Sequence, residues 1–486
     1  MASFLPLLGN VESGPIPSSL LHRFPRFQFA ILCLLRTLDP MNFTQIFPYV
    51  NDFVLDLHLT SDPAQIGYYC GLLESSFALL QLLAIYPWGL VSDRVGRRPV
   101  VLVGIAGVAS ATISFGLSRS FTMALLSRAL AGLFSGNVTV IPSMVCEITS
   151  EKTQAFAYSF FGLWWPLGAI IGPLIGGLFS NPATKYPRYF DTELMRSYPY
   201  FLPCLLVSSC TSLGLLLSLC FLEETLQPRE TKQLMAPRAY GSTRSETHST
   251  ASRRHISFRK LFNIPIIQAL CYSGCALSFM STAFEVIFVQ FCFSPVSAGG
   301  LGFPAAKIGF ALSIAGVIAA LLQGLFMPTI LRRVDHASMY HFCMKLWPIA
   351  ILLMPLLNVI ARRGEEHVGM QNLSFSANLL LWTSIALILG LARIAHLPYT
   401  INVLLVKRYV PHRFCLGSTL AMVQFCICFS RAFSPALASL VYTSSIRSNS
   451  VLGGNLWVAS MVAMGLLSCS LSKMVVKESL KLSGGS

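Results

Sequence analysis

Long apolar stretches separated by polar connections recur along the whole chain. Each stretch is mainly apolar over roughly 20 residues or more, and its apolar positions are continuous rather than alternating with a period of two. A helix of that length crosses about 30 Å of hydrocarbon and satisfies its own backbone hydrogen bonds, as lipid requires. The pattern predicts an all-α integral membrane protein with twelve transmembrane helices, at about residues 27–50, 66–88, 99–118, 121–144, 154–179, 200–222, 264–292, 306–330, 338–360, 376–405, 416–442 and 455–475.

One connection is much longer than the others and divides the predicted helices six and six. Residues 223–263 hold eight basic and four acidic side chains among Pro, Ser and Thr, which is typical of a flexible linker near an anionic membrane surface. A regulatory phosphorylation or docking role for this linker stays open. The predicted organisation is therefore an N-terminal tail (1–26), a first six-helix half (27–222), the linker (223–263), a second six-helix half (264–475) and a C-terminal tail (476–486).

The two halves echo each other weakly. The sequence GLFMPTILRR at 324–333 occupies the same connection in the second half that GLVSDRVGRR at 89–98 occupies in the first. Likewise, RAFSPALAS at 431–439 echoes GAIIGPLIGG at 168–177. Pseudo-repeated six-helix halves with a pathway between them suit alternating access.

Composition and charge agree with a membrane protein and set its orientation. The chain is 54% hydrophobic and 11% charged, with a mean hydropathy of +0.64 and a net charge of +15. Of its 35 Lys and Arg residues, 21 fall in the two tails, in the linker and in the connections that lie on the same side of the membrane as the tails. The positive-inside rule therefore places both termini and the linker in the cytosol, and the positive charge does not indicate a nucleic-acid partner. The first predicted helix is long and charged, unlike a cleaved signal, and we expect it to be retained.

The connection at 89–98 concentrates charge between two apolar helices. Its distinctive positions are Gly89, Asp93, Arg94, Gly96, Arg97 and Arg98. Glycines let two helices approach closely, while the acid and the arginines form ion pairs. We expect Asp93 to cap the eleventh predicted helix near residue 416 and to hold the cytosolic side closed in the outward-facing state. The alternative is that the arginines only fix the topology.

Ionisable residues inside the predicted helices are few and costly, so function is the default hypothesis for them. The proton-coupling candidates are Asp39, Arg36, Glu74, Arg128 and Glu285. Asp39 follows Arg36 by three residues, so the two share a helix face and can pair. Asp39 is the leading candidate because a carboxylate that loses its cationic partner can take up a proton. A static ion pair that only shapes the cavity is the alternative.

No catalytic or cofactor site is indicated. The fourteen cysteines lie almost all within predicted helices without a Cys-x-x-Cys pair, and the nine histidines form no cluster with metal-ligand spacing. The chain also lacks a P-loop and a nucleophile-elbow motif. We therefore expect no metal, no cofactor and no enzyme activity, and transport driven by a gradient rather than by ATP.

Several motifs carry a family resemblance. The 89–98 loop resembles the signature loop of the major facilitator superfamily, and Arg128 with Gly132 and Gly136 resembles its fourth-helix arginine motif. More locally, GLLESSFALLQ (71–81), the segment 128–149 and FLEET (221–225) resemble the fungal twelve-helix drug:proton antiporters and the plant zinc-induced facilitator-like proteins. This resemblance implies the major facilitator fold and proton-driven export.

The fifth predicted helix also fits the antiporter-type motif of that family, with Gly168, Gly172, Pro173, Gly176 and Gly177. Its glycines form a smooth face for close helix packing and its prolines introduce a kink. The resemblance implies that this kinked helix seals an interface against leak; tight packing alone is the other interpretation. The candidates for lining a substrate cavity are Gln81, Asn137, Tyr272, Gln290, Arg393, Tyr399 and Arg431.

The residues and the resemblance together predict a secondary active transporter that moves small organic molecules by alternating access. We expect proton-coupled export of drug-like or natural-product compounds. A proton-coupled nutrient uptake symporter and a non-transporting membrane sensor of the same fold stay open as alternatives. The expected partners are a small-molecule substrate, protons and the lipid bilayer, for a monomer in the plasma or vacuolar membrane.

Overall fold

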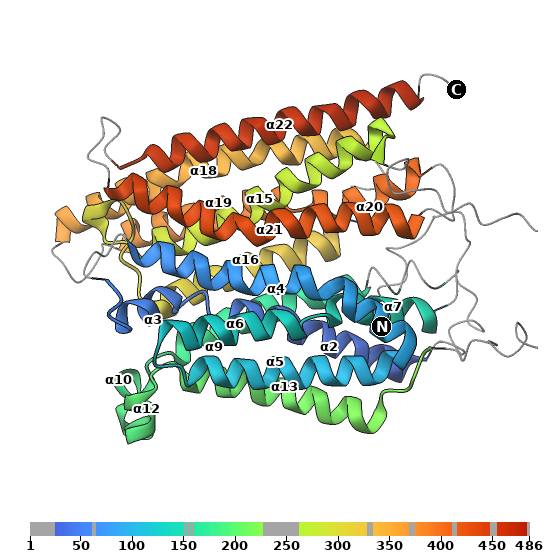
Figure 1. The fold of residues 1–486 in the computed structure, drawn as a ribbon. Helices are drawn as coiled ribbons and strands as arrows, with labels where there is room; N and C mark the ends of the chain where they lie inside the picture. Colours follow the sequence, from blue (N-terminus) through green and yellow to red (C-terminus); the bar gives the residue numbers. More distant parts are fainter. Residues whose placement is uncertain are drawn as a thin grey trace, which may run out of the picture.

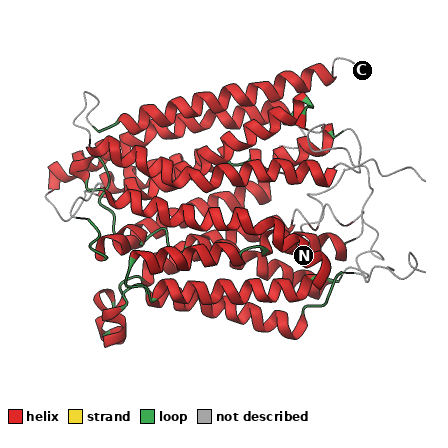
Figure 2. Ribbon diagram, viewed as in Figure 1, coloured by secondary structure: helices red, strands yellow, loops and turns green. Residues whose placement is uncertain are grey.

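The computed structural model describes residues 25–60, 65–149, 160–226, 262–327, 334–368, 375–410, 416–447 and 454–483, with residues 153 and 157 between the second and third ranges. Its described part is helical throughout and contains no strand (Figure 2). Most of the predicted N-terminal tail and most of the predicted linker lie outside the described residues.

The helices of the first half pack around one another in a bundle (Figure 1). They are α2 (Arg26–Thr44), α3 (Val50–Asp56), α4 (Ile66–Val95), α5 (Arg97–Gly116), α6 (Phe121–Phe134), α7 (Asn137–Ile148), α9 (Trp164–Phe179) and α13 (Phe201–Phe221). Three short helices precede α13, namely α10 (Pro182–Lys185), α11 (Pro187–Phe190) and α12 (Glu193–Ser197).

The second half is also a bundle of helices (Figure 1). They are α15 (Pro265–Phe293), α16 (Ala305–Leu321), α18 (His336–Val368), α19 (Phe375–Ala395), α20 (Pro398–Tyr409), α21 (Leu416–Arg447) and α22 (Leu456–Ser483). The 3-10 turn η3 (Val296–Ala298) follows α15, and the π-helical turn η4 (Leu322–Phe326) continues α16. The predicted C-terminal tail begins inside α22, because that helix continues to Ser483.

Eleven helices in the described part are long and apolar enough to cross a membrane, and they correspond to the second to twelfth predicted spans. The first predicted span is α2, which lies in the bundle beside α9 and α13 but is less apolar because Arg26, Arg36 and Asp39 fall within its 19 residues. Two crossings are broken: α6 and α7 together form one, Phe121–Ile148, and α19 with α20 form another, Ser376–Tyr409.

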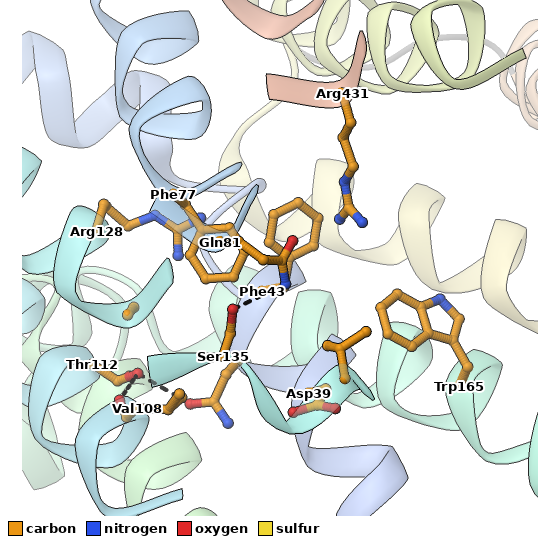
Figure 3. A pocket seen from close by; sticks show the side chains of 13 residues that line it. Asp39, Phe43, Phe77, Gln81, Val108, Thr112, Arg128, Ser135, Trp165 and Arg431 are labelled. Atoms are coloured by element: carbon orange, nitrogen blue, oxygen red, sulfur yellow. Dashed lines mark hydrogen bonds between the residues drawn. The ribbon is translucent and has the colours of Figure 1, made fainter. Parts of the chain in front are cut away.

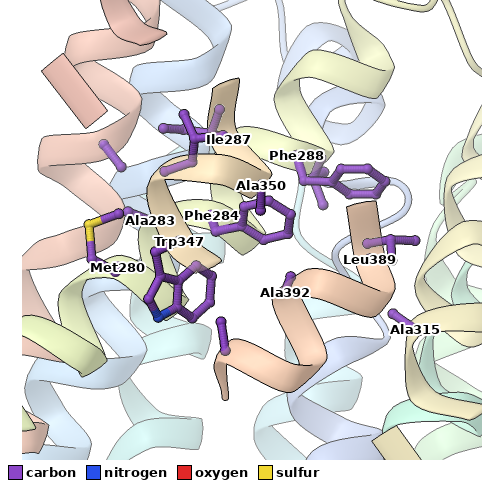
Figure 4. Close-up of a cluster of buried hydrophobic side chains, with 14 of the residues drawn as sticks. Met280, Ala283, Phe284, Ile287, Phe288, Ala315, Trp347, Ala350, Leu389 and Ala392 are labelled. Atoms are coloured by element: carbon purple, nitrogen blue, oxygen red, sulfur yellow. The ribbon is translucent and has the colours of Figure 1, made fainter. Parts of the chain in front are cut away.

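A large apolar core fills the second half. Phe284 stacks near Phe288 with ring centroids 6.1 Å apart, and Trp347 approaches Phe284 at 5.7 Å (Figure 4). Trp347 and Phe288 are completely buried. These side chains fix α15 against α18, so the second half forms a firm support for residues that face the first half.

The glycines of α9 allow very close helix packing. A side-chain carbon on Gly172 would lie 2.5 Å from Thr44 Oγ1 and 2.8 Å from Met41 O of α2. One on Gly177, on the other side of α9, would lie 2.7 Å from Ala305 O and 3.1 Å from the Cα atom of Gly309 in α16. The helix therefore contacts both halves through backbone, which only glycine permits at these positions.

The two halves meet along α4 with α21 and along α9 with α16. We call the side that carries the 89–98 connection and both described chain ends the basic side (Figure 1). At the opposite side, Gly67 and Gly71 of α4 lie against α21, and the N–H of Ala436 donates to Ser75 Oγ at 3.0 Å. At the basic side, a side-chain carbon on Gly89 would meet no atom within 4 Å. The halves are thus joined at the opposite side in this conformation.

Candidate substrate cavity and buried charges

A small cavity lies inside the first half and faces α21 (Figure 3). Its lining residues are Asp39, Asn42, Phe43, Phe77, Gln81, Val108, Thr112, Arg128, Ala131, Ser135, Val138, Trp165 and Arg431. Only Arg431 among them belongs to the second half. The cavity volume is about 30 Å³, so an organic substrate requires the halves to separate further.

Helical spacing brings the lining residues together. Asp39, Asn42 and Phe43 of α2 are three and four residues apart, which places them on one face of that helix. Phe77 and Gln81 follow the same rule on α4. The cavity therefore forms where the inward faces of α2, α4 and α6 converge.

Part of the cavity wall is a satisfied polar network. Asn42 Nδ2 donates to Thr211 Oγ1 at 2.8 Å and to Leu38 O at 2.9 Å, while Thr112 Oγ1 donates to Asn42 Oδ1 at 3.1 Å. These bonds tie α2 to α5 and α13. Such bonds fix the orientation of the wall, because each buried group has its partner.

Arg36 and Asp39 do not form the predicted ion pair, since no nitrogen–oxygen distance within 4.0 Å joins them in the described part of the chain. The Arg36 guanidinium instead lies over the rings of Trp165, at 4.7 Å, and Phe161, at 5.4 Å. Asp39 Oδ2 is buried without a hydrogen-bond partner among the described residues. One oxygen of this cavity-lining carboxylate thus lacks a partner, which is costly when the group is ionised.

Glu74 and Arg128 are also buried without pairing. Each is 4% exposed, and no ion pair joins them within the described ranges. Arg128 lies over the Phe77 ring at 4.6 Å, and its Nε and Nη2 have no hydrogen-bond partner there. Arg431 lies over the Phe43 ring at 4.8 Å. Aromatic faces therefore provide much of the contact that these guanidinium groups make.

A second group of charged side chains surrounds the proton-coupling candidate Glu285 in the second half. Arg393 Nη1 lies 3.1 Å from Glu285 Oε1, and His396 Nε2 lies 3.7 Å from the same oxygen. His396 Nδ1 lies 2.7 Å from Ala392 O, and because a carbonyl oxygen only accepts, Nδ1 carries the proton. In the neutral imidazole, Nε2 is then the unprotonated nitrogen and faces Glu285.

The other predicted cavity residues lie elsewhere. Asn137 Nδ2 donates to Val101 O at 3.3 Å, Tyr399 shares a hydrogen bond with Ser281 at 2.7 Å, and Tyr272 is 44% exposed. Gln290 Nε2 donates to Gly67 O at 3.0 Å and to Ser439 Oγ at 2.6 Å, so it joins α15 to α4 and α21 at the opposite side.

Of the seven predicted cavity residues, only Gln81 and Arg431 line this cavity. Sequence reasoning missed Asn42, Phe43 and Phe77. Two of them follow Asp39 by three and four residues, so their position on its helix face was the signal that could have found them.

Two glutamates at the ends of other helices bind the 89–98 connection. Arg97 pairs with Asp93 at 2.7 Å and with Glu147 of α7 at 3.1 Å. Glu224, just after α13, accepts the backbone N–H of Arg97 at 2.8 Å and of Arg98 at 3.0 Å. Sequence reasoning missed both glutamates. In this conformation, Asp93 therefore contacts its own turn.

Gly96 and Glu224 fit each other closely. Gly96 has φ +119°, and a side-chain carbon there would lie 2.5 Å from Glu224 Oε2, so glycine is required. Partial burial raises the pKa of Glu224, but the hydrogen bonds from the N–H groups of Leu226, Arg97 and Arg98 outweigh burial and lower the pKa below its ordinary value. Glu224 therefore stays ionised and holds the start of α5.

Comparisons with known proteins agree with this architecture. The model of the Major Facilitator Superfamily matches residues 32–435. Psilocybe cubensis "Major facilitator-type transporter psiT2" is 38% identical, covering 87% of this chain and 84% of that protein. Aspergillus niger "Efflux pump azaK" is 28% identical, covering 88% and 85%.

A plant protein and a solved structure extend the comparison. Arabidopsis thaliana "Protein ZINC INDUCED FACILITATOR 1" is 30% identical, covering 60% of this chain and 62% of that protein. The crystal structure of a D-xylose-proton symporter superposes with a TM-score of 0.67 at 13% identity, covering 93% of this chain and 97% of that one. The expected resemblance to fungal transporters and plant facilitator-like proteins is confirmed, and so is the twelve-helix fold.

Proposed function

This chain belongs to the major facilitator superfamily, and we propose that it is a proton-coupled exporter of amphipathic organic molecules. The observation that carries the proposal is that Arg431 of the second half enters a cavity built by the first half. A site shared by both halves changes when they rock against each other, which is the requirement for alternating access.

Export as the direction is supported by the relatives and by the charge pattern. One fungal relative is named an efflux pump, and the positive-inside rule makes the basic side cytosolic, with both termini there. The opposite side is closed by contacts between α4 and α21, so a substrate would enter from the cytosol. The membrane is the plasma or the vacuolar membrane, and the functional unit is a monomer.

Proton coupling is assigned first to Asp39. Its carboxylate lies in the cavity with one oxygen unpaired, so a change in its surroundings alters the cost of its charge. Glu74 with Arg128, and Glu285 with Arg393, are the further coupling sites. Asp93 forms different contacts in different states. In the outward-facing conformation it releases Arg97 of its own turn and caps α21.

The test is proton movement in liposomes that contain the purified full-length protein. A pH gradient is imposed and lipophilic cations, azoles and organic anions are added in turn, with wild type beside Asp39→Asn. The matched control is Asp191→Asn, because Asp191 pairs with Arg196 outside the membrane-spanning helices.

The proposal is supported if adding substrate makes protons move in the direction opposite to the substrate. This movement should be lost in Asp39→Asn and kept in Asp191→Asn. Movement of protons and substrate in the same direction indicates the uptake symporter instead. Binding of a compound without any transport by folded protein indicates a sensor of the same fold. Proton movement that survives Asp39→Asn assigns the coupling to Glu74 or Glu285.

A further inference from the structure

Two guanidinium groups from opposite halves share one aromatic ring in the cavity. Arg128 of α6 and Arg431 of α21 lie over Phe43, with Cζ atoms 5.8 Å and 4.8 Å from the ring centroid. These two distances together limit the separation of the Cζ atoms to at most about 10.6 Å. Figure 3 shows both side chains directed toward the space beside Phe43 and Phe77. We call these two residues the arginine pair.

Arg128 of the arginine pair has unused hydrogen-bond donors. Arg128 is 4% exposed, and its Nε and Nη2 atoms are buried without a partner in the described part of the chain. Neither member forms an ion pair within 4.0 Å with any described acid, Glu74 and Asp39 included. Buried guanidinium groups are normally paired, because an uncompensated charge in a low-dielectric site is costly. Within the described part of the chain, neither guanidinium group is therefore held in an ion pair.

The remaining lining residues indicate an aromatic ligand with polar edges. Phe43, Phe77 and Trp165 provide aromatic faces, and Gln81 with Ser135 provides an amide and a hydroxyl. Among the lining residues, Asp39 is the one acid beside two arginines. An oxyanion would meet two guanidinium groups that can each bind it through two hydrogen bonds, whereas a cationic ligand would be repelled by the same two groups.

We infer that the arginine pair binds the oxyanion group of an aromatic substrate, which is a carboxylate, a sulfonate or a phosphate. The aromatic ring of the substrate packs against the three aromatic side chains, while its charged group lies between α6 and α21. Because the arginines come from different halves, a bound oxyanion is attracted to both halves at once and favours their closure around it. This inference rests on the proposed transport function and specifies its substrate class.

The test compares three ligands that share one ring system and differ in charge. They are 2-naphthoate, 2-naphthamide and 2-naphthylmethylammonium, titrated into purified full-length protein in lipid nanodiscs by calorimetry at neutral pH. We expect 2-naphthoate to bind at least about 10-fold more tightly than the amide, because charge-assisted hydrogen bonds add to ring packing. We expect the ammonium compound to bind more weakly than the amide.

Variants of the arginine pair locate the site. Arg431→Gln should weaken 2-naphthoate binding by about 10- to 100-fold and leave 2-naphthamide binding nearly unchanged. Arg431→Lys should retain part of the affinity, since the charge remains and the bidentate geometry is lost. Arg188→Gln, on α11 outside the membrane-spanning helices, is the matched control and should bind all three ligands like wild type. Thermal unfolding of each variant shows that it is folded.

Three results would overturn the inference: equal affinity for naphthoate and naphthamide, tighter binding of the ammonium compound, or unchanged naphthoate affinity in folded Arg431→Gln. Failure of this inference is separate from failure of the proposed function. Transport of neutral or cationic compounds in the liposome assay would keep the exporter and reject the oxyanion site. Charge-selective binding without transport would keep the oxyanion site and reject the exporter.

Discussion

Gly71 offers the sharpest test of how the opposite side is closed. It lies on α4 against α21, where a side-chain carbon would be 2.5 Å from Ser439 Oγ and 2.8 Å from Pro435 O. Ser439 cannot rotate away freely, since its hydroxyl accepts a hydrogen bond from Gln290 at 2.6 Å. Gly71→Ala therefore requires α21 to retreat from α4.

The size of this effect follows from the distances. An ordinary contact begins near 3.4 Å, so the Pro435 carbonyl must move by about 0.6 Å. Overpacking of this kind costs about 1–3 kcal/mol. A free-energy change of about 1.4 kcal/mol corresponds to a factor of ten in population. The conformation with α4 and α21 in contact at the opposite side therefore becomes about 5- to 150-fold less populated, relative to conformations in which the two helices separate there.

Hydrogen exchange measured by mass spectrometry reports this change without labels. We expect faster exchange in Gly71→Ala for peptides covering 66–75 and 435–445 than in wild type. Gly390→Ala is the matched control, because a side-chain carbon on Gly390 would meet no atom within 4 Å and both variants gain the same helix propensity, about 1 kcal/mol. Equal exchange in Gly71→Ala and Gly390→Ala would refute the proposed role of this contact.

Three further predictions concern the polar network and the basic side. Asn42→Leu should lower thermal stability by about 1–3 kcal/mol in the free energy of unfolding, because Thr112 and Thr211 lose a buried partner; unchanged melting would contradict this. Asp93→Asn should change stability by less than about 0.5 kcal/mol, since Asp93 is exposed, yet reduce substrate flux in liposomes; normal flux would reject its state-selective role. Glu224 has a lowered pKa, so its contribution to stability is present above about pH 4.3 and lost as the pH falls through its folded pKa. Glu224→Gln should therefore flatten the acid end of the melting-temperature profile, and an unchanged slope there would count against it.

Much of the fold could be read from the sequence because the membrane acts on each segment separately. A segment either contains enough apolar residues to cross hydrocarbon or it does not, which is a property of neighbouring residues alone. The second to twelfth spans were predicted on that basis, and eleven such helices are present. The first span, α2, is the informative exception, since Arg36 and Asp39 lower its hydropathy while its neighbours still hold it in the bundle.

The candidate site could be read only in part. Intramembrane charge marked Asp39, Arg128 and Arg431 in the sequence, because such residues are costly and rare in helices that cross lipid. Sequence spacing also placed Arg36 and Asp39 on one helix face, but the structure turns Arg36 toward the Trp165 and Phe161 rings. Shared spacing makes a pair possible, and the surrounding side chains decide whether it forms.

The sequence by itself therefore determined the membrane-spanning helices, the charged loop and the short inventory of intramembrane ions. The tertiary structure decided which of those ions share a cavity, and it alone brought Arg431 beside Phe43 of the other half. It also supplied Glu224 as the partner that makes glycine necessary at position 96. The physical reason is that hydropathy is local, whereas the rotation of each helix about its axis is set by close packing against segments distant in the chain.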